Sequence, residues 1–459
     1  MAEQMMQHKA DELAAKQTIP AGYKQTEVGV IPEDWKVDPL GVLINQIEYG
    51  SSAKSSSRGR VPVLRMGNLQ DGQIDWGDLV YTNNDYEISK YELNDGDVLF
   101  NRTNSIDLVG KTALYKGIKK AIFAGYLIRI KVDPQCLDAR YLNYFLNTPT
   151  ARKYGLSVVS VGVSQANING QKLKSYPIPY PAHVEEQVSI ATALSDTDAL
   201  ITGLEQLIAK KQAIKTAAMQ QLLTGRTRLP QFALRPDGTP KGYKSSELGQ
   251  IPEDWEVLAI DDCATKVGSG KTPNGGASVY IDAGRPFVRS QNIGWGKLIL
   301  DDVAYISDDI HNTFSGSEIK EGDVLLNITG ASIGRCAITE EYIVGGNVNQ
   351  HVCIIRLNSV LLNARLLVEL INSRNGQKQI DSYQAGGNRE GLNFQQVRQL
   401  KFTVSNSSVE QTAIATILSD MDNELNALEQ KLAKARDLKQ GMMQQLLTGR
   451  IRLPLPQEA

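Results

Sequence analysis

The sequence predicts two mixed α/β globules in tandem, each followed by a long helix, so that the chain is an internal duplication. Three observations support this fold class. The segment from residue 185 to residue 226 returns at residues 409–450, and Met219–Arg226 is identical to Met443–Arg450. The run IPEDW occurs at Ile31 and again at Ile251. Between these landmarks each half has short β-rich runs broken by Gly, Asn and Asp.

Hydrophobic residues in both long segments follow the 4-3 spacing of a coiled-coil seam. The second copy has at these places Ile414, Leu418, Met421, Leu425, Leu428, Leu432, Ala435, Lys439, Met442 and Leu446. The first copy has Ile190, Leu194, Thr197, Ile201, Leu204, Ile208, Lys211, Lys215, Ala218 and Leu222. The seam lysines need solvent or acidic neighbours, for which Glu205 and Glu429 are candidates. A helix of roughly 40 residues is about 60 Å long, which is the length of a spacer.

The ends of the two helices carry recognisable signals. Gly225 and Gly449 are placed to take the left-handed conformation that ends a helix. Ser407 stands three residues before Glu410, the spacing of a capping box. Both signals support helices that start and stop at matching places in the two copies.

The landmarks divide the chain into an N-terminal segment (1–21), a first globule (22–182), a central spacer helix (183–226), a linker (227–241), a second globule (242–406), a C-terminal spacer helix (407–450) and a tail (451–459). The globules share a strand that begins with Gly-Asp-Val, at residues 96–101 and 322–327. Their loops differ, as residues 160–170 and 384–394 show. A common fold with divergent loops suggests two readers of different targets.

Composition excludes several classes of protein. Hydrophobic residues make up 41% of the chain, enough for real cores, but no window approaches 18 apolar residues and the polar start is no signal peptide. We therefore expect a cytoplasmic protein without a membrane span. The four cysteines and four histidines lack metal-ligand spacing. A net charge of −2 means that any nucleic-acid binding must come from local patches.

No stretch predicts a catalytic centre. Residues 268–272 (GSGKT) resemble a phosphate-binding loop, but its first glycine is missing. A nuclease-like set at Asp309, Glu318 and Lys320 has no counterpart in the first half. The nucleophile, zinc-protease and amino-methylation motifs are absent. We expect no catalytic residue and no metal site in this chain.

Basic side chains are concentrated in Gly-, Ser- and Asn-rich stretches of both globules. Residues 49–70 contain four Lys or Arg and no acid, and residues 263–300 contain five against one Asp. Solvated surface loops are the alternative for each stretch alone, and turn formation is the alternative for Asn68 and Asn292. Recurrence in both globules favours contact with phosphates and base edges. The candidates are Lys54, Arg58, Arg60, Arg65, Asn68, Arg102, Asn104, Lys111, Gln165, Lys271, Arg285, Arg289, Asn292, Arg335, Asn388 and Arg389.

The repeated unit has IPEDW at its start, a GDV-L strand in its middle and an EQ-x-x-IA-x-x-LS-D helix that ends in LL-TGR. In these features it resembles the specificity subunit of type I restriction-modification systems, from Gly22 to Pro454. The resemblance implies two target-recognition domains in tandem, each reading half of a split sequence in double-stranded DNA. It also implies that the two helices form an antiparallel coiled coil with pseudo-two-fold symmetry.

The resemblance further implies partners that bring the cofactors. Two modification subunits would use S-adenosylmethionine to methylate adenine, and restriction subunits would translocate and cleave with ATP and Mg²⁺. Repeated surfaces would serve for docking and spacing, with the candidates Trp35, Trp255, Ile190, Leu194, Ile201, Leu204, Ile414, Leu418, Leu425 and Leu428. The alternative hypothesis is a tandem scaffold that binds proteins and does not read DNA.

Overall fold

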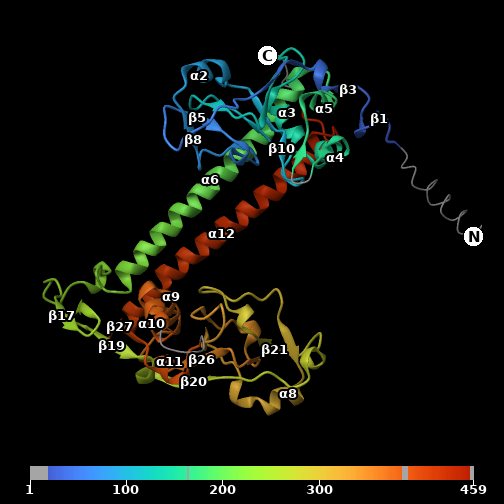
Figure 1. Cartoon of the computed structure of the whole chain (residues 1–459). Coiled ribbons are helices and arrows are strands. Elements are labelled where there is room, and N and C mark those ends of the chain that lie inside the picture. The colour runs from blue at the N-terminus through green and yellow to red at the C-terminus, as the bar shows by residue number, and fades with distance from the viewer. Residues whose placement is uncertain (1–18, 163–164, 385–390, 455–459) are drawn as a thin grey trace, which may run out of the picture. The chain divides into compact units, whose positions relative to one another are not determined.

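The computed structural model describes residues 19–162, 165–384 and 391–454. Contacts divide the chain into two units (Figure 1). Unit 1 comprises residues 1–205 and 431–459, and unit 2 comprises residues 206–430. Most of the predicted N-terminal segment (1–21) lies outside the described residues.

A six-stranded sheet with the order β4-β13-β9-β11-β7-β6 forms the centre of unit 1. Its strands are β4 (Ile44–Tyr49), β13 (Leu127–Val132), β9 (Val98–Asn101), β11 (Thr112–Leu114), β7 (Gly72–Ile74) and β6 (Leu69–Gln70). Smaller sheets are β1 (Tyr23–Thr26) with β2 (Gly29–Pro32), β3 (Trp35–Pro39) with β16 (Pro177–Pro181), β12 (Ile122–Phe123) with β5 (Val61–Leu64) and β8 (Val80–Thr82), and β10 (Thr103–Asn104) with β15 (Ala166–Asn167) and β14 (Ser160–Val161). The helices are α2 (Asp85–Tyr91), α3 (Ala139–Leu146), α4 (Pro149–Val158) and α5 (Gly170–Lys174).

Unit 2 repeats this plan around a four-stranded sheet with the order β20-β26-β23-β24. These strands are β20 (Ala264–Ser269), β26 (Val352–Leu357), β23 (Val324–Asn327) and β24 (Cys336–Ile338). Smaller sheets are β17 (Tyr243–Ser246) with β18 (Gly249–Pro252), β19 (Trp255–Ala259) with β27 (Lys401–Ser405), and β21 (Arg285–Val288) with β22 (Ala304–Ile306) and β25 (Asn347–Val348). The helices are α7 (Ile260–Cys263), α8 (Asp308–Thr313), α9 (Ala364–Asn372), α10 (Arg374–Gln384) and α11 (Phe394–Arg398).

The shared Gly-Asp-Val run keeps its aspartate for a structural reason. Asp323 is fully buried and accepts two hydrogen bonds of 2.7 Å from Arg356, which lies on the neighbouring strand β26. In unit 1 the buried Asp97 faces Arg129 on β13 in the same way, at 3.5 Å. A buried carboxylate without its cation would be costly. Both copies therefore keep the pair.

The two long helices are α6 (Val184–Leu222) and α12 (Ser408–Leu446), and both contribute to both units. They run antiparallel in each unit: Asp198 and Glu205 pair with Lys439 and Arg436 in unit 1. The spacing predicted from the sequence is confirmed, because every predicted seam residue is buried or half-buried. By contrast Leu200 and Leu438, which lie off the seam, are more than half exposed.

The seam lysines find acidic partners other than the ones predicted. Lys439 lies 2.6 Å from Asp198, and Lys215 binds Asp422. Lys211 lies 2.7 Å from Glu424. Glu205 instead pairs with an arginine of α12, so the prediction of Glu205 and Glu429 as partners of these lysines was wrong. The partner of a seam residue depends on the stagger of the helices, which the spacing in one helix does not encode.

The helix ends close over the tryptophans of IPEDW. Gly225 and Gly449 both have φ of 66°, as predicted, and a Cβ on either would lie 2.4 Å from Pro252 or Pro32. The Ser407 hydroxyl caps α12 by accepting from the Glu410 amide at 3.4 Å. The Glu410 side chain does not complete the predicted capping box, since it accepts instead from Ser405, Trp255 and Arg228.

Candidate nucleic-acid interface

In unit 1 several loops gather where three strands of the central sheet end. Tyr49 at the end of β4 and Asn101 at the end of β9 both lie beside the start of β13. The loops that follow or precede these strands, residues 50–60, 102–111 and 124–126, therefore meet at one edge, which we call the loop edge. Strand β10 within the second loop pairs with β15, and β15 pairs with β14, which adds residues 160–161 and 166–167 to this edge.

Unit 2 has the same loop edge. Ser269 at the end of β20 and Asn327 at the end of β23 flank the start of β26. The loops here are residues 270–284, 328–335 and 349–351. The second loop closes in the same way in both units: the backbone N–H of Asn101 donates to the Lys111 carbonyl, and the backbone N–H of Asn327 donates to the Arg335 carbonyl, both at 2.9 Å.

Several predicted nucleic-acid residues meet at the loop edge of unit 1. Arg102 donates from Nε to the Gly125 carbonyl at 2.9 Å, and its guanidinium lies 4.9 Å from the centre of the Tyr49 ring. Asn104 pairs with Ala166, beside Gln165. Lys54 and Arg58 are exposed in the first loop. At this edge Arg102 thus lies on the same loop as Asn104, whose strand partner follows Gln165.

Four predicted arginines form four ion pairs, two in unit 1 and the two equivalent ones in unit 2. Arg65 lies 2.9 Å from Asp78, and Arg289 lies 3.3 Å from Asp302. Arg60 binds Asp85, and Arg285 lies 2.8 Å from Asp308. The four aspartate side chains are 74–96% exposed. Exposed pairs of this kind are weak. The aspartates therefore hold the arginines in place, but a DNA phosphate can displace an aspartate and bind the arginine.

The structure favours the turn-forming alternative for Asn68 and Asn292. Both are buried. Asn292 accepts from the Arg289 amide at 3.0 Å and donates to the carbonyls of Ile299 and Asp302. Asn68 makes the equivalent bonds. Their amides hold the arginine-bearing turns, so these two residues support the loop edge from inside and do not face a ligand.

The remaining candidates are spread more widely. Lys271 opens the first loop of unit 2, with its ammonium 5.0 Å from the centre of the Phe314 ring. Lys111 donates to Gln70 at 3.3 Å, and Arg335 stands at the equivalent place, where the second loop closes. Asn388 and Arg389 lie outside the described residues.

The residues predicted to dock partners are mostly interior. Trp35 is 0% exposed and Trp255 is 2% exposed, because the long helices end over them. Ile190, Leu194, Ile414 and Leu418 lie in the hydrophobic cores of the two units, so these six side chains are not free to dock a partner, and the four helix residues serve only the seam of the spacer. The seam residues Leu425 and Leu428 are buried, whereas Ile201 and Leu204 are half-buried.

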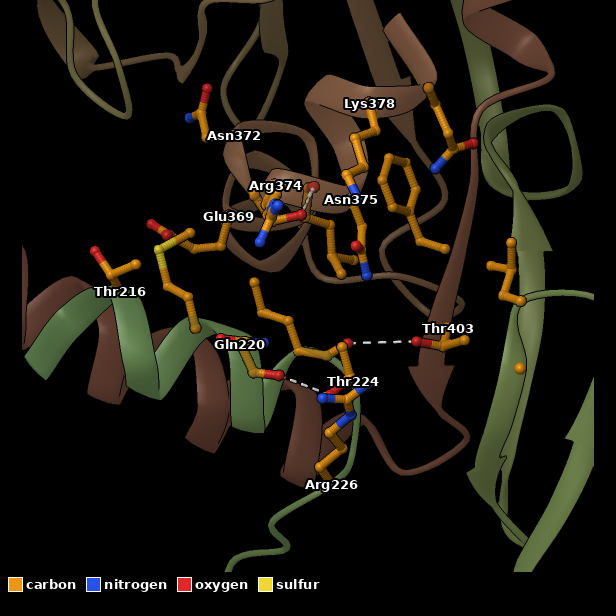
Figure 2. Close-up of a pocket in the computed structure, with 18 of the residues that line it drawn as sticks. Thr216, Gln220, Thr224, Arg226, Glu369, Asn372, Arg374, Asn375, Lys378 and Thr403 are labelled. Atoms are coloured by element: carbon orange, nitrogen blue, oxygen red, sulfur yellow. Dashed lines mark hydrogen bonds between the residues drawn. The ribbon is translucent and has the colours of Figure 1, made fainter. Parts of the chain in front are cut away.

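Each unit has a groove between a long helix and its globule. In unit 2 a cavity of about 1210 Å³ lies between α6, the hairpin β17–β18 and the junction of α9 with α10. Figure 2 shows Gln220, Thr224 and Arg226 on one side and Glu369, Arg374 and Lys378 on the other, with the Thr403 hydroxyl 3.3 Å from the Leu223 carbonyl. Unit 1 has a cavity of about 960 Å³ between α12 and the matching elements.

The two grooves differ in charge. In unit 2 the charged lining residues are Lys215, Arg226, Arg374, Lys378, Lys401 and a single acid, Glu369. In unit 1 they are Arg436, Lys439, Arg450, Asp71, Asp75, Asp198 and Glu205. The groove of unit 2 is therefore more positive than its counterpart.

Within the described ranges, no group of three or more His, Cys, Asp or Glu is arranged to hold a metal ion. No helix in the same ranges is long and apolar enough to cross a membrane.

Comparison with known families matches residues 32–216 and 252–435 to the type I restriction modification DNA specificity domain, once for each copy of the sequence repeat. The chain belongs to this family. As a family member it is a DNA-specificity subunit of a type I restriction-modification system, which confirms the resemblance noted in the sequence. The two matches also confirm that the duplication covers globule and helix together.

Individual proteins similar to this chain are also named as type I specificity subunits. The chain is 25% identical over 429 residues to the type I restriction enzyme MjaVIII specificity subunit of Methanocaldococcus jannaschii, covering 92% of this chain and 94% of that one. It is 29% identical over 311 residues to the putative MjaX specificity subunit of the same organism, covering 67% and 69%. The fold resembles the crystal structure of a type I restriction-modification S subunit from M. genitalium, with a TM-score of 0.59, 15% identity and coverage of 93% and 97%.

Proposed function

We propose that each unit of this specificity subunit reads one half of a split DNA sequence through its loop edge. The observation that carries the proposal is the recurrence of this edge on matching strand ends with different loop side chains. Arg65 and Arg289, with their aspartates, stand beside it, because the residues before them accept from the Ala124 and Asn349 amides of the edge. Because the two units share a scaffold, they would make matching contacts to the phosphate backbone, and these contacts fix the position of each unit on the DNA. Unequal loops account for two different half-sites, because bases are distinguished by the side chains that meet their edges.

The chain itself contributes recognition and no chemistry in this proposal. Two modification subunits would supply S-adenosylmethionine and methylate adenine, which must leave the base stack to be reached. Restriction subunits would supply ATP-driven translocation and Mg²⁺-dependent cleavage. The two grooves between long helix and globule support two equivalent docking places, since they lie on matching elements in both units.

The test is to co-express the chain with its modification subunit and map N6-methyladenine across the host genome by single-molecule sequencing. We expect a split motif with a fixed gap and one methylated adenine in each half. A stable complex with an active modification subunit but no methylation that depends on this chain would contradict the proposal and favour a protein scaffold.

A further inference from the structure

A tight turn with the same geometry stands at the centre of the loop edge in both units. In unit 1 it spans residues 124–127, and the Leu127 amide donates to the Ala124 carbonyl at 2.9 Å. In unit 2 it spans residues 349–352, and the Val352 amide donates to the Asn349 carbonyl at 3.4 Å. The third residue of the turn is Tyr126 in unit 1 and His351 in unit 2.

The second strand-end loop fixes the backbone of this third residue identically in the two units. The Tyr126 carbonyl accepts from the Arg102 amide at 3.1 Å, and the His351 carbonyl accepts from the Ile328 amide at 3.0 Å. The first loop also contacts the turn. In unit 1 the Gly125 amide of the turn donates to the Ser51 carbonyl of the loop at 2.6 Å, and in unit 2 the Gly270 amide of the loop donates to the Asn349 carbonyl of the turn at 3.2 Å. The carbonyl of the third residue is therefore held in the same way in both units, whereas the bond to the first loop runs in opposite directions and the side chain differs.

The surroundings of Tyr126 suit a nucleic acid. Its side chain belongs to no core, since the residue is 51% exposed. Arg102, which holds its carbonyl, also binds the Gly125 carbonyl and stacks on Tyr49, itself 43% exposed. The Tyr126 phenol offers both an aromatic face and a hydrogen-bonding tip.

His351 presents a different set of polar groups at the same place. Its Nε2 lies 3.0 Å from the Gln350 amide nitrogen, and its Nδ1 binds the Thr329 hydroxyl. The amide nitrogen can only donate, so Nε2 is the acceptor and Nδ1 carries the proton. The Thr272 hydroxyl donates to the Gln350 oxygen, so first and second loops are joined through this turn. Exposed Gln350 adds the side-chain amide that pairs with adenine edges.

We propose that position 126 in unit 1 and position 351 in unit 2 are specificity-determining, each meeting one base pair of the half-site read by its own unit. The inference rests on the proposed function, because it assumes that the loop edge faces DNA. It goes beyond that function by naming the residue at which the two units share a backbone and differ in chemistry.

The test compares the complexes of wild type, Tyr126→Ala, Tyr126→Phe, Tyr126→His and His351→Tyr with the modification subunit. Methylation mapping and competition binding with duplexes varied at single positions give the preference at each base pair. We expect each variant to lose about tenfold to hundredfold discrimination at one position of one half-site, as the loss of one base contact predicts. The other half-site should stay unchanged and serves as an internal control.

A matched control is Tyr342→Ala, since Tyr342 is 57% exposed and follows β24, whose last residue pairs with the first residue of β23, at the end opposite the loop edge. Unchanged selectivity of Tyr126→Ala and His351→Tyr would overturn the inference, and so would a uniform loss of affinity for all sequences. Tyr126→Phe and Tyr126→His keep the test valid if the alanine variant does not fold. A wild-type complex without any split motif would instead refute the proposed function.

Discussion

Arg228, which follows helix α6, makes a two-point ion pair with Glu410 in the first turn of helix α12. Its Nε lies 2.7 Å from Oε1, and its Nη2 lies 2.8 Å from Oε2. The same guanidinium binds Asp254 of the second IPEDW run. In unit 1 Arg452, which follows α12, binds Glu186 of α6 and Asp34 in the same manner.

The ion pairs of Arg228 and of Arg452 are buried to different extents. We therefore expect their loss to cost different amounts of stability. The Arg228 side chain is 7% exposed and its partner Glu410 is 1% exposed, whereas Arg452 is 39% exposed. Loss of one partner of a buried pair costs about 3–5 kcal/mol. We expect Arg228→Ala to destabilise unit 2 by this amount and Arg452→Ala to destabilise unit 1 by less. Hydrogen exchange measured peptide by peptide distinguishes the units, and equal loosening of both would contradict the prediction.

Gly225 should not tolerate a side chain. An alanine there would adopt φ of 66° and place its Cβ 2.4 Å from Pro252. Left-handed backbone alone costs about 1 kcal/mol for a residue with a Cβ, so the total loss should exceed this. The control is Gly203→Ala on α6, where a Cβ meets no atom within 4 Å and stability should rise by about 0.5–1 kcal/mol. Thermal unfolding of both variants checks the opposite signs.

Glu369 should make unit 2 sensitive to pH. Burial raises its pKa from 4.5 to about 7, against the attraction of Lys215 at 4.0 Å and with a further rise from Asp422. The native state therefore holds this proton above pH 4.5 while the unfolded state releases it, so stability falls as pH rises towards 7. The fall is at most about 3 kcal/mol.

Glu369→Gln should remove this pH dependence. Unit 1 has Tyr144 at the matching place, hydrogen-bonded to Asp198 at 2.7 Å, and provides an internal control. Denaturant unfolding, monitored by hydrogen exchange between pH 5 and pH 8, measures for each unit the slope of the unfolding free energy against pH. A slope that survives in Glu369→Gln would assign it to another group.

Arg289→Ala should weaken DNA binding by the complex without dissolving the complex. Loss of a phosphate contact lowers affinity for all sequences and reduces the slope of affinity against salt by about one unit. Arg398→Ala is the matched control, because Arg398 pairs with the exposed Asp261 at 2.7 Å but lies away from the loop edge. If both variants bind like wild type, Arg289 makes no phosphate contact.

Asp302→Asn should have the opposite effect. Its carboxylate is 79% exposed, competes for Arg289 and repels a phosphate. We expect binding to tighten by a few-fold at low salt and the gain to fade as salt rises. Glu321→Gln, an exposed acid before β23 and so at the opposite end of that strand, removes the same charge and should leave affinity unchanged. Weaker binding by Asp302→Asn would show that the aspartate positions Arg289 productively.

The parts of the structure that the sequence predicts are those encoded locally or by repetition. The seam spacing, the left-handed Gly225 and Gly449 and the paired globules all follow from patterns within one copy or between copies. The acids Asp78 and Asp302 were missed because they stand 13 residues beyond their arginines, across irregular loops. The burial of Trp35 was missed because the helix end that covers it comes from the far end of the chain.

The segment that is repeated in the sequence is not the segment that packs together in the structure. The repeat in the sequence is a globule followed by its own helix, yet each tryptophan is covered by the glycine that ends the other helix, Gly449 over Trp35 and Gly225 over Trp255. In one repeat alone the tryptophan would be uncovered, and the two acids that bind the arginine would lack it. A single copy of the repeat could therefore complete this fold only by exchanging helix ends with a second copy of itself.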